Sequence, residues 1–220
     1  MLKKLFATMC IVGILGSAVG TANAAPFSES FNDGFPPAGW SIDNLNSTPG
    51  GTTTWFKGEP AIFAAQSGAP DSYAAANFNA AGFGGNIRDW LISPTISVMN
   101  GAMLSFFTRT ELLGFNDTLQ VRMCKNAACT LPFSTANFST ILLPTFTVPD
   151  AWTQETATIS GLSAGDTVRI AFGYLCNDTS VNCNYVGIDS VTAVPEPSML
   201  LVFALGLTSL GWSLRRNGIR

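Results

Sequence analysis

The sequence contains no histidine, and only 11% of its 220 residues are charged. The absence of histidine excludes Ser-His-Asp and Cys-His catalytic arrangements, and it excludes any zinc or iron site that depends on histidine. No C-x-x-C motif is present, so the redox chemistry of that motif is excluded as well. The sequence therefore predicts a protein that is not an enzyme. A hydrolase that uses two carboxylates is the remaining catalytic alternative, because 14 acidic residues always supply candidate pairs.

Basic residues are scarce in the central part of the chain. Five of the eleven lie in the two end segments: Lys3, Lys4, Arg215, Arg216 and Arg220. The region through Glu196 keeps 6 basic residues against all 14 acidic ones, which gives it a net charge of −8. A region this acidic lacks the phosphate-neutralising surface of a nucleic-acid-binding protein, so we expect no nucleic-acid partner. The negative charge is compatible with cation binding.

The first 24 residues have the pattern of a signal peptide. Lys3 and Lys4 form a basic start, Leu5–Val19 is an apolar run, and Ala22–Ala24 is a cleavage site of small residues. A first transmembrane helix is the alternative, but the apolar run is short for one. We therefore expect an exported protein with one domain in residues 25–193.

Four cysteines remain after Cys10, which lies within the signal peptide. They fall into two close pairs, Cys124 with Cys129 and Cys176 with Cys183. Exported proteins fold in an oxidising compartment, so we predict a local disulfide within each pair. A four-thiolate zinc site is the alternative, although the spacings are looser than those of zinc ribbons.

No segment between Ala25 and Ala193 has a helical period, and strand signals recur instead. Apolar and polar residues alternate in Leu119–Met123 and in Val168–Tyr174. The other expected strands are Phe27–Phe31, Trp55–Lys57, Ser72–Asn77, Asp89–Ile92, Met103–Thr108, Thr153–Ile159 and Tyr185–Ala193. Many short strands without helices predict an all-β fold, a β-sandwich of jelly-roll type. Asn100-Gly101 is the best candidate for a hairpin turn.

A Pro-Glu-Pro triplet, an apolar run and a basic cluster follow one another in residues 194–220. The run Met199–Leu214 contains no charge. As a helix it would be roughly 24 Å long, so we expect one apolar C-terminal helix at the inner membrane. This segment resembles the PEP-CTERM sorting signals of Gram-negative bacteria. The resemblance implies an exosortase-like enzyme as partner, processing at Val194, Pro195, Glu196 and Pro197, and delivery to the cell surface or extracellular matrix. An ordinary membrane anchor is the alternative.

Four stretches carry a second resemblance: Phe27–Trp40, Arg88–Val98, Ala151–Tyr174 and Val186–Ala193. They resemble the cleaved-adhesin or choice-of-anchor J domains, which are related to MAM domains. The resemblance implies a jelly-roll sandwich that serves as a non-catalytic surface module in adhesion or ligand binding. It also implies that the first and last strands lie side by side.

The resemblance further implies that acidic residues on those two strands can hold a structural Ca²⁺. The residues that match here are Glu29 and Asp189, with Asp33 as a possible third ligand. Carboxylate oxygens suit Ca²⁺, which takes six to eight oxygen ligands. The alternative is that Glu29 and Asp33 are solvated and that Asp189 caps a turn.

Aromatic residues within polar segments are candidates for stacking on sugar rings. Trp55, Phe83 and Phe115 are the best placed, and we expect them to contact exopolysaccharide or a cell-surface glycan. The sequence thus favours an exported, non-catalytic binding or adhesion module. A structural matrix protein without a discrete ligand is the first alternative, and an extracellular polysaccharide hydrolase is the second.

Overall fold

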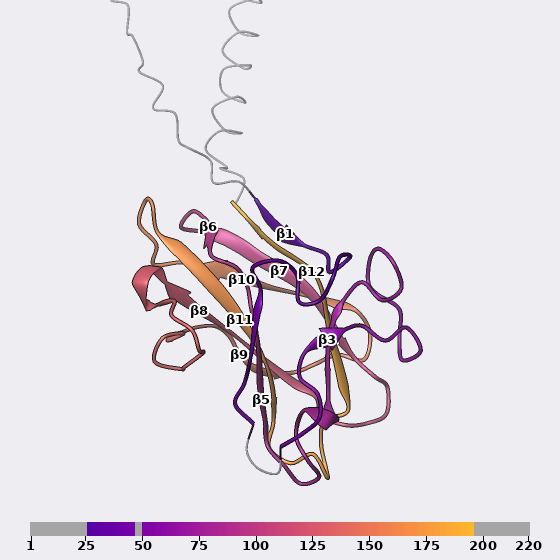
Figure 1. Ribbon diagram of the computed structural model, residues 1–220. Coiled ribbons are helices and arrows are strands. Elements are labelled where there is room, and N and C mark those ends of the chain that lie inside the picture. The colour runs from indigo at the N-terminus through magenta and orange to yellow at the C-terminus, as the bar shows by residue number, and fades with distance from the viewer. Residues whose placement is uncertain (1–25, 47–49, 196–220) are drawn as a thin grey trace, which may run out of the picture.

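Two antiparallel sheets of six strands each pack face to face in the computed structural model, which describes residues 26–46 and 50–195 (Figure 1). Sheet A has the order β10-β7-β12-β4-β3, with β1 added at β12. Its strands are β1 (Phe27–Glu29), β3 (Phe56–Lys57), β4 (Ala74–Asn77), β7 (Ala102–Thr110), β10 (Thr153–Ile159) and β12 (Tyr185–Val194).

Sheet B has the order β2-β5-β11-β8-β9, with β6 added at β11. Its strands are β2 (Ser41–Asn44), β5 (Ile87–Ile92), β6 (Ile96–Ser97), β8 (Thr118–Lys125), β9 (Thr140–Thr147) and β11 (Thr167–Cys176). Two short 3-10 helices, η1 (Phe78–Ala80) and η2 (Asn126–Ala128), complete the described elements. The predicted all-β sandwich of jelly-roll type is confirmed.

Several predictions concern residues outside the described part of the chain. They are the signal peptide (1–24), the apolar C-terminal helix, and Glu196 and Pro197 of the sorting motif. Within residues 26–46 and 50–195, no helix is long and apolar enough to cross a membrane.

Alternating side chains of the long central strands fill the space between the sheets. Leu119, Val121 and Met123 of β8 are buried, and so are all four apolar residues predicted for β11: Val168, Ile170, Phe172 and Tyr174. The alternation predicted for both strands is therefore confirmed. Trp40 stacks on Phe172 with ring centroids 6.3 Å apart. Since burial of one large apolar side chain contributes about 2 kcal/mol, the inward faces of these strands dominate the stability of the fold.

The predicted hairpin at Asn100-Gly101 is wrong. The turn does have the expected left-handed geometry, because Gly101 has φ +86°. It joins β6 to β7, however, and β6 pairs with β11 in sheet B whereas β7 pairs with β10 and β12 in sheet A. The chain crosses from one sheet to the other at this turn, so turn chemistry alone did not decide which strands pair.

Long connections cover part of the outer face of each sheet. Over sheet A, residues 58–72 place Phe63 against Tyr73, with ring centroids 5.1 Å apart. The guanidinium carbon of Arg109 lies 4.3 Å from the centroid of the Phe63 ring. Over sheet B, residues 126–139 stack Phe133 on Trp90 at 3.9 Å between centroids. These contacts remove most of the remaining aromatic rings from solvent.

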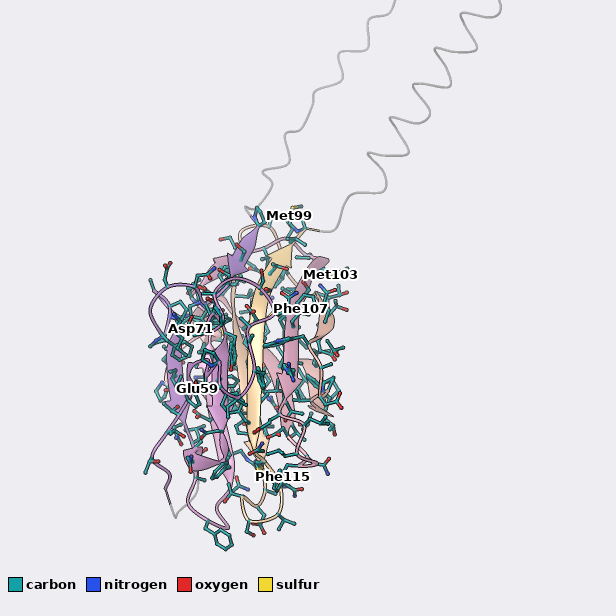
Figure 2. The ribbon with its side chains drawn as sticks, turned by 90° about the vertical axis from the view of Figure 1, so that its right-hand side faces the viewer. Glu59, Asp71, Met99, Met103, Phe107 and Phe115 are labelled. Carbon is teal, nitrogen blue, oxygen red and sulfur yellow. A yellow bond between two sulfur atoms is a disulfide. The ribbon has the colours of Figure 1, made fainter. Side chains whose placement is uncertain are left out.

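The first and last strands lie side by side, as the resemblance implied. Phe27 of β1 pairs with Ala193 of β12, and Glu29 pairs with Val191. The start of β1 and the end of β12 therefore lie at one end of the sandwich (Figure 1). Figure 2 shows Met99 and Met103 at this end and Phe115 at the opposite one.

Candidate functional site: an aromatic groove at one end of the sandwich

Three phenylalanine side chains are exposed at the end of the sandwich that lies away from the start of β1. The exposed fractions are 87% for Phe83, 44% for Phe78 and 41% for Phe115. They are the exposed aromatic side chains of the described part of the chain. All three line one groove of about 450 Å³, which we call the aromatic groove. Its other walls come from Gly50, Gly51, Thr52, Asn79, Ala81, Gly82, Thr179, Ser180, Cys183 and Asn184.

Thr179 holds the Phe83 turn in place. Its hydroxyl donates to the carbonyl of Gly82 at 2.7 Å and accepts from the amide of Gly85 at 3.1 Å. The amide of Thr179 in turn donates to the carbonyl of Gly85 at 3.0 Å. Gly84, with φ +73°, supplies the left-handed residue that this turn needs. Hydrogen bonds at Gly82 and Gly85, on either side of Phe83, therefore fix the turn to the segment that follows β11.

A buried carboxyl supports the floor of the aromatic groove. Asp117 accepts hydrogen bonds from the hydroxyl of Tyr174 at 2.5 Å and from the amide of Asn184 at 2.8 Å, and the Thr110 hydroxyl donates to its other oxygen. Burial raises the pKa of Asp117, and it raises the pKa of Tyr174 well above its usual value. Asp117 thus links the Phe115 segment to Asn184, a residue of the groove wall.

The walls of the aromatic groove combine ring faces with amide and hydroxyl groups. This composition is typical of sites that bind uncharged polar ligands, where apolar contact gives affinity and a few polar groups give orientation. Among the described residues, those that line the aromatic groove include no Asp or Glu. A hydrolysis that needs two facing carboxylates has no such groups here.

The structure brings two of the three predicted aromatic residues together and separates the third. Phe83 and Phe115 line the same groove, although 31 intervening residues separate them in the sequence. Trp55 is only 2% exposed, and its ring N–H donates to the carbonyl of Asp89 at 3.0 Å. Its ring faces are covered by the core, so Trp55 is corrected from a sugar contact to a core residue. Phe78 belongs to the groove, and sequence reasoning missed it.

Both predicted disulfides are confirmed, between Cys124 and Cys129 and between Cys176 and Cys183. The four-thiolate zinc alternative is therefore wrong, because each cysteine is bonded to its neighbour. The second disulfide closes the segment 176–183, whose residues Thr179, Ser180 and Cys183 line the aromatic groove.

The predicted calcium ligands occupy different surroundings. Asp189 is fully buried, and it accepts from the amides of Ser67 at 3.0 Å and Ser190 at 2.5 Å. Burial raises its pKa to about 6. Glu29 lies on the neighbouring strand and accepts from the amide of Phe31 at 2.7 Å. Asp33 is exposed and makes no hydrogen bond or ion pair within the described residues.

Oxygen atoms suited to Ca²⁺ gather around Gly68 in the connection that covers sheet A, next to Ser67, whose amide donates to Asp189. The hydroxyl of Ser72 is buried without a hydrogen-bond partner in the described structure. A Cβ at Gly68 would lie 2.5 Å from Oδ1 of Asn32 and 3.4 Å from Cβ of Ser72, so these groups converge. The described residues contain no group of three or more His, Cys, Asp or Glu that could hold a metal. A fit to Ca²⁺ therefore depends on amide, hydroxyl and backbone oxygens around Asp189.

Comparison with known proteins identifies the end of the chain and the fold. Residues 193–216 match the PEP-CTERM protein-sorting motif, which indicates an exported, surface-targeted protein and implies processing by an exosortase-like system. The fold is similar to that of the K1 cleaved adhesin domain of Lys-gingipain from Porphyromonas gingivalis. The TM-score is 0.60 at 21% identity, over 79% of this chain and 100% of that chain.

The K3 cleaved adhesin domain of Lys-gingipain from the same organism gives a TM-score of 0.58 at 20% identity, over 79% of this chain and 99% of that chain. No curated protein matches the chain. Both sequence resemblances are thus confirmed: a PEP-CTERM sorting motif follows a domain with the cleaved-adhesin fold.

Proposed function

We propose that the protein is a non-catalytic module of the Gram-negative cell surface or extracellular matrix, and that it binds polysaccharide through the aromatic groove. The observation that carries this proposal is the clustering of Phe78, Phe83 and Phe115 in one groove. The other aromatic rings of the described part are at least partly buried. A group of exposed apolar side chains around one groove is typical of a ligand-binding site.

The position of the groove supports the proposal. It lies at the opposite end of the sandwich from Met99 and Met103, which lie beside the start of β1 and the end of β12 (Figure 2). If residues 199–214 hold the chain at the inner membrane, the groove would face away from that membrane. After delivery to the cell surface through the same end, the groove would face away from the surface. A ligand would then reach the groove before and after processing.

Two observations favour binding over catalysis. The described lining of the groove carries no carboxylate. The string Gly161–Gly165 reads G-x-S-x-G, but it joins β10 to β11 and not a strand to a helix, and the chain has no histidine to activate Ser163. We assign Ca²⁺ at Asp189 a structural role, that of holding residues 66–68 on β12.

A glycan array probed with the full-length chain tests the proposal, with Phe83→Ala as the groove variant and Leu131→Ala as its matched control. Leu131 is also exposed, at 44%, but it lies in the connection over sheet B. We expect Phe83→Ala to weaken binding by about fivefold to 150-fold, since one stacked ring contributes about 1–3 kcal/mol, and Leu131→Ala to bind like wild type.

Three results would contradict the proposal. Equal binding by wild type and Phe83→Ala would remove the groove from recognition. Retention in biofilm matrix without binding to any glycan would favour the structural matrix protein. Release of sugars from polysaccharide by the purified chain would favour the hydrolase.

A further inference from the structure

A second, polar pocket lies on the other side of the Cys176–Cys183 segment. It has a volume of about 290 Å³, near the lower limit of about 300–1,000 Å³ for small-ligand sites. Arg88 of β5, Asn177 and Asn182 line it, together with Asn116 and two threonines of β8 and β9. We call it the Arg88 pocket. No aromatic side chain lines it, in contrast to the aromatic groove.

The cation of Arg88 has no carboxylate partner among the described residues. The ion pairs of this part of the chain join Lys57 to Asp71 and Lys125 to Asp166. Arg88 donates instead to the carbonyl of Ile87 at 3.1 Å and to Oδ1 of Asn177 at 3.3 Å. A guanidinium carries five N–H donors, so several remain for a ligand.

The nearby acid, Asp178, makes no ion pair with Arg88. Asp178 is half-buried next to Asn177, and its Oδ1 accepts from the amide of Ser180 at 2.8 Å and from the Ser180 hydroxyl at 2.5 Å. Asp178 is not among the residues that line the pocket. Arg88 is therefore the charged residue among those that line the pocket.

Two amide side chains beside the cation are available for hydrogen bonding. Those of Asn116 and Asn182 make no hydrogen bond within the described structure. An amide can both donate and accept, which suits the hydroxyls of a sugar, whereas the planar guanidinium fork suits a carboxylate. One cation and two free amides thus match a sugar that carries a carboxylate.

The Arg88 pocket and the aromatic groove share their dividing wall. Phe115 lines the groove and Asn116 lines the pocket, and the disulfide-closed segment contributes Thr179 to one and Asn177 to the other. We propose that the chain binds an acidic polysaccharide, with a uronate carboxylate on Arg88 and neighbouring sugar rings in the aromatic groove. This inference rests on the proposed function and specifies its ligand class.

Polygalacturonate and its fully methyl-esterified form are a matched pair of probes, because the sugar backbone is the same and the charged carboxylate of one is a neutral methyl ester in the other. We expect the full-length chain to bind polygalacturonate at least about tenfold more tightly than the ester. Arg88→Gln should bind the two forms equally. Arg88→Lys should recover part of the preference, because it keeps the charge and loses the fork.

Arg169→Gln is the matched control, because it removes the same charge at a residue whose Nε donates to Thr95, away from the pocket. It should keep the full preference. An unchanged melting temperature for Arg88→Gln shows that the variant is folded. Equal affinity of wild type for both polymers, or a preference that survives in Arg88→Gln, would overturn the inference.

The same measurements separate this inference from the proposed function. If Phe83→Ala weakens binding of both polymers but wild type shows no preference for charge, the groove binds glycan and the inference fails. If galacturonate monomer or inorganic sulfate binds as tightly as the polymer, the pocket is a small-anion site and the inference also fails. If the preference for polygalacturonate over the ester is lost in Arg88→Gln but binding is unchanged in Phe83→Ala, the Arg88 pocket binds the carboxylate and the proposed role of the aromatic groove is wrong.

Discussion

Asp89 is a fully buried carboxyl on β5, which lies between β2 and β11 in sheet B. Its Oδ1 accepts from the hydroxyl of Thr54 at 2.8 Å, and its Oδ2 has no hydrogen-bond partner in the described structure. Burial raises its pKa from 3.8 to about 7, and the bond from Thr54 offsets only part of this shift. The folded protein therefore binds a proton at Asp89 that the unfolded chain releases above about pH 4.

This difference predicts a loss of stability as the pH rises. Below pH 4 both states are protonated, and between pH 4 and pH 8 ionisation of Asp89 disfavours the folded state by up to about 4 kcal/mol. Urea unfolding of wild type should give a lower free energy of unfolding at pH 8 than at pH 4.5. The Asp89→Asn variant should lack the part of this decrease that comes from ionisation of Asp89. The exposed Asp150→Asn variant should follow wild type. Identical pH profiles for wild type and Asp89→Asn would contradict the prediction.

The exposure of single aromatic residues was only partly predictable from sequence. Phe83 lies among glycine and alanine, which supply no side chains to cover it, and it is exposed as expected. Trp55 follows three threonines and has an equally polar neighbourhood, yet it is buried. Its ring N–H donates to the carbonyl of Asp89, which lies 34 residues later in the sequence, and no local sequence pattern reveals such a contact.

The disulfide-closed segment 176–183 is the element shared by both candidate binding surfaces. Replacing Cys176 and Cys183 together by Ser should cost about 2 kcal/mol, because the closed loop is short. Since the disulfide would no longer restrain the segment that carries Thr179 and Asn177, we expect binding of polygalacturonate to fall at least about tenfold.

The first disulfide provides the matched control. Cys124→Ser with Cys129→Ser removes a loop of similar length over sheet B. It should cost a similar free energy of unfolding, measured by urea denaturation, and leave binding unchanged. Equal loss of binding in both double variants would show that global stability, and not the position of the segment, sets affinity.

Strands with a strong apolar alternation were predictable, and those without it were not. The predicted Leu119–Met123 lies within β8, and both β8 and β11 have the expected inward residues. The missed strands are β2, β6 and β9. Strand β9 is an edge strand with Pro144 and an irregular register against β8, and its residues are half-buried or exposed. Such a strand forms because β8 offers it hydrogen bonds, and its own sequence carries little signal.

Calcium would act on the stability of the whole sandwich, because Asp189 joins residues 66–68 to β12 at the centre of sheet A. If the ion binds there, chelation should lower the melting temperature of wild type by about 5–10 °C, as expected for a ligand at about 100 times its Kd.

Asp189→Ala should melt at the same temperature with and without chelator. Asp33→Ala should respond like wild type, because Asp33 is exposed and has no partner within the described residues. A wild type that chelator leaves unchanged would remove the calcium proposal. A chelator response that Asp33→Ala abolishes would assign the ion to the originally predicted ligand set.

The pairing of β1 with β12 has a further consequence for a population of molecules. Copies fixed side by side by the same end would present their Phe83 ends as one continuous layer. A long polymer could then touch many copies at once, and avidity would exceed the affinity of one copy by about 10²–10⁴-fold. A weak single site would suffice to hold a strand of polymer on a densely coated cell.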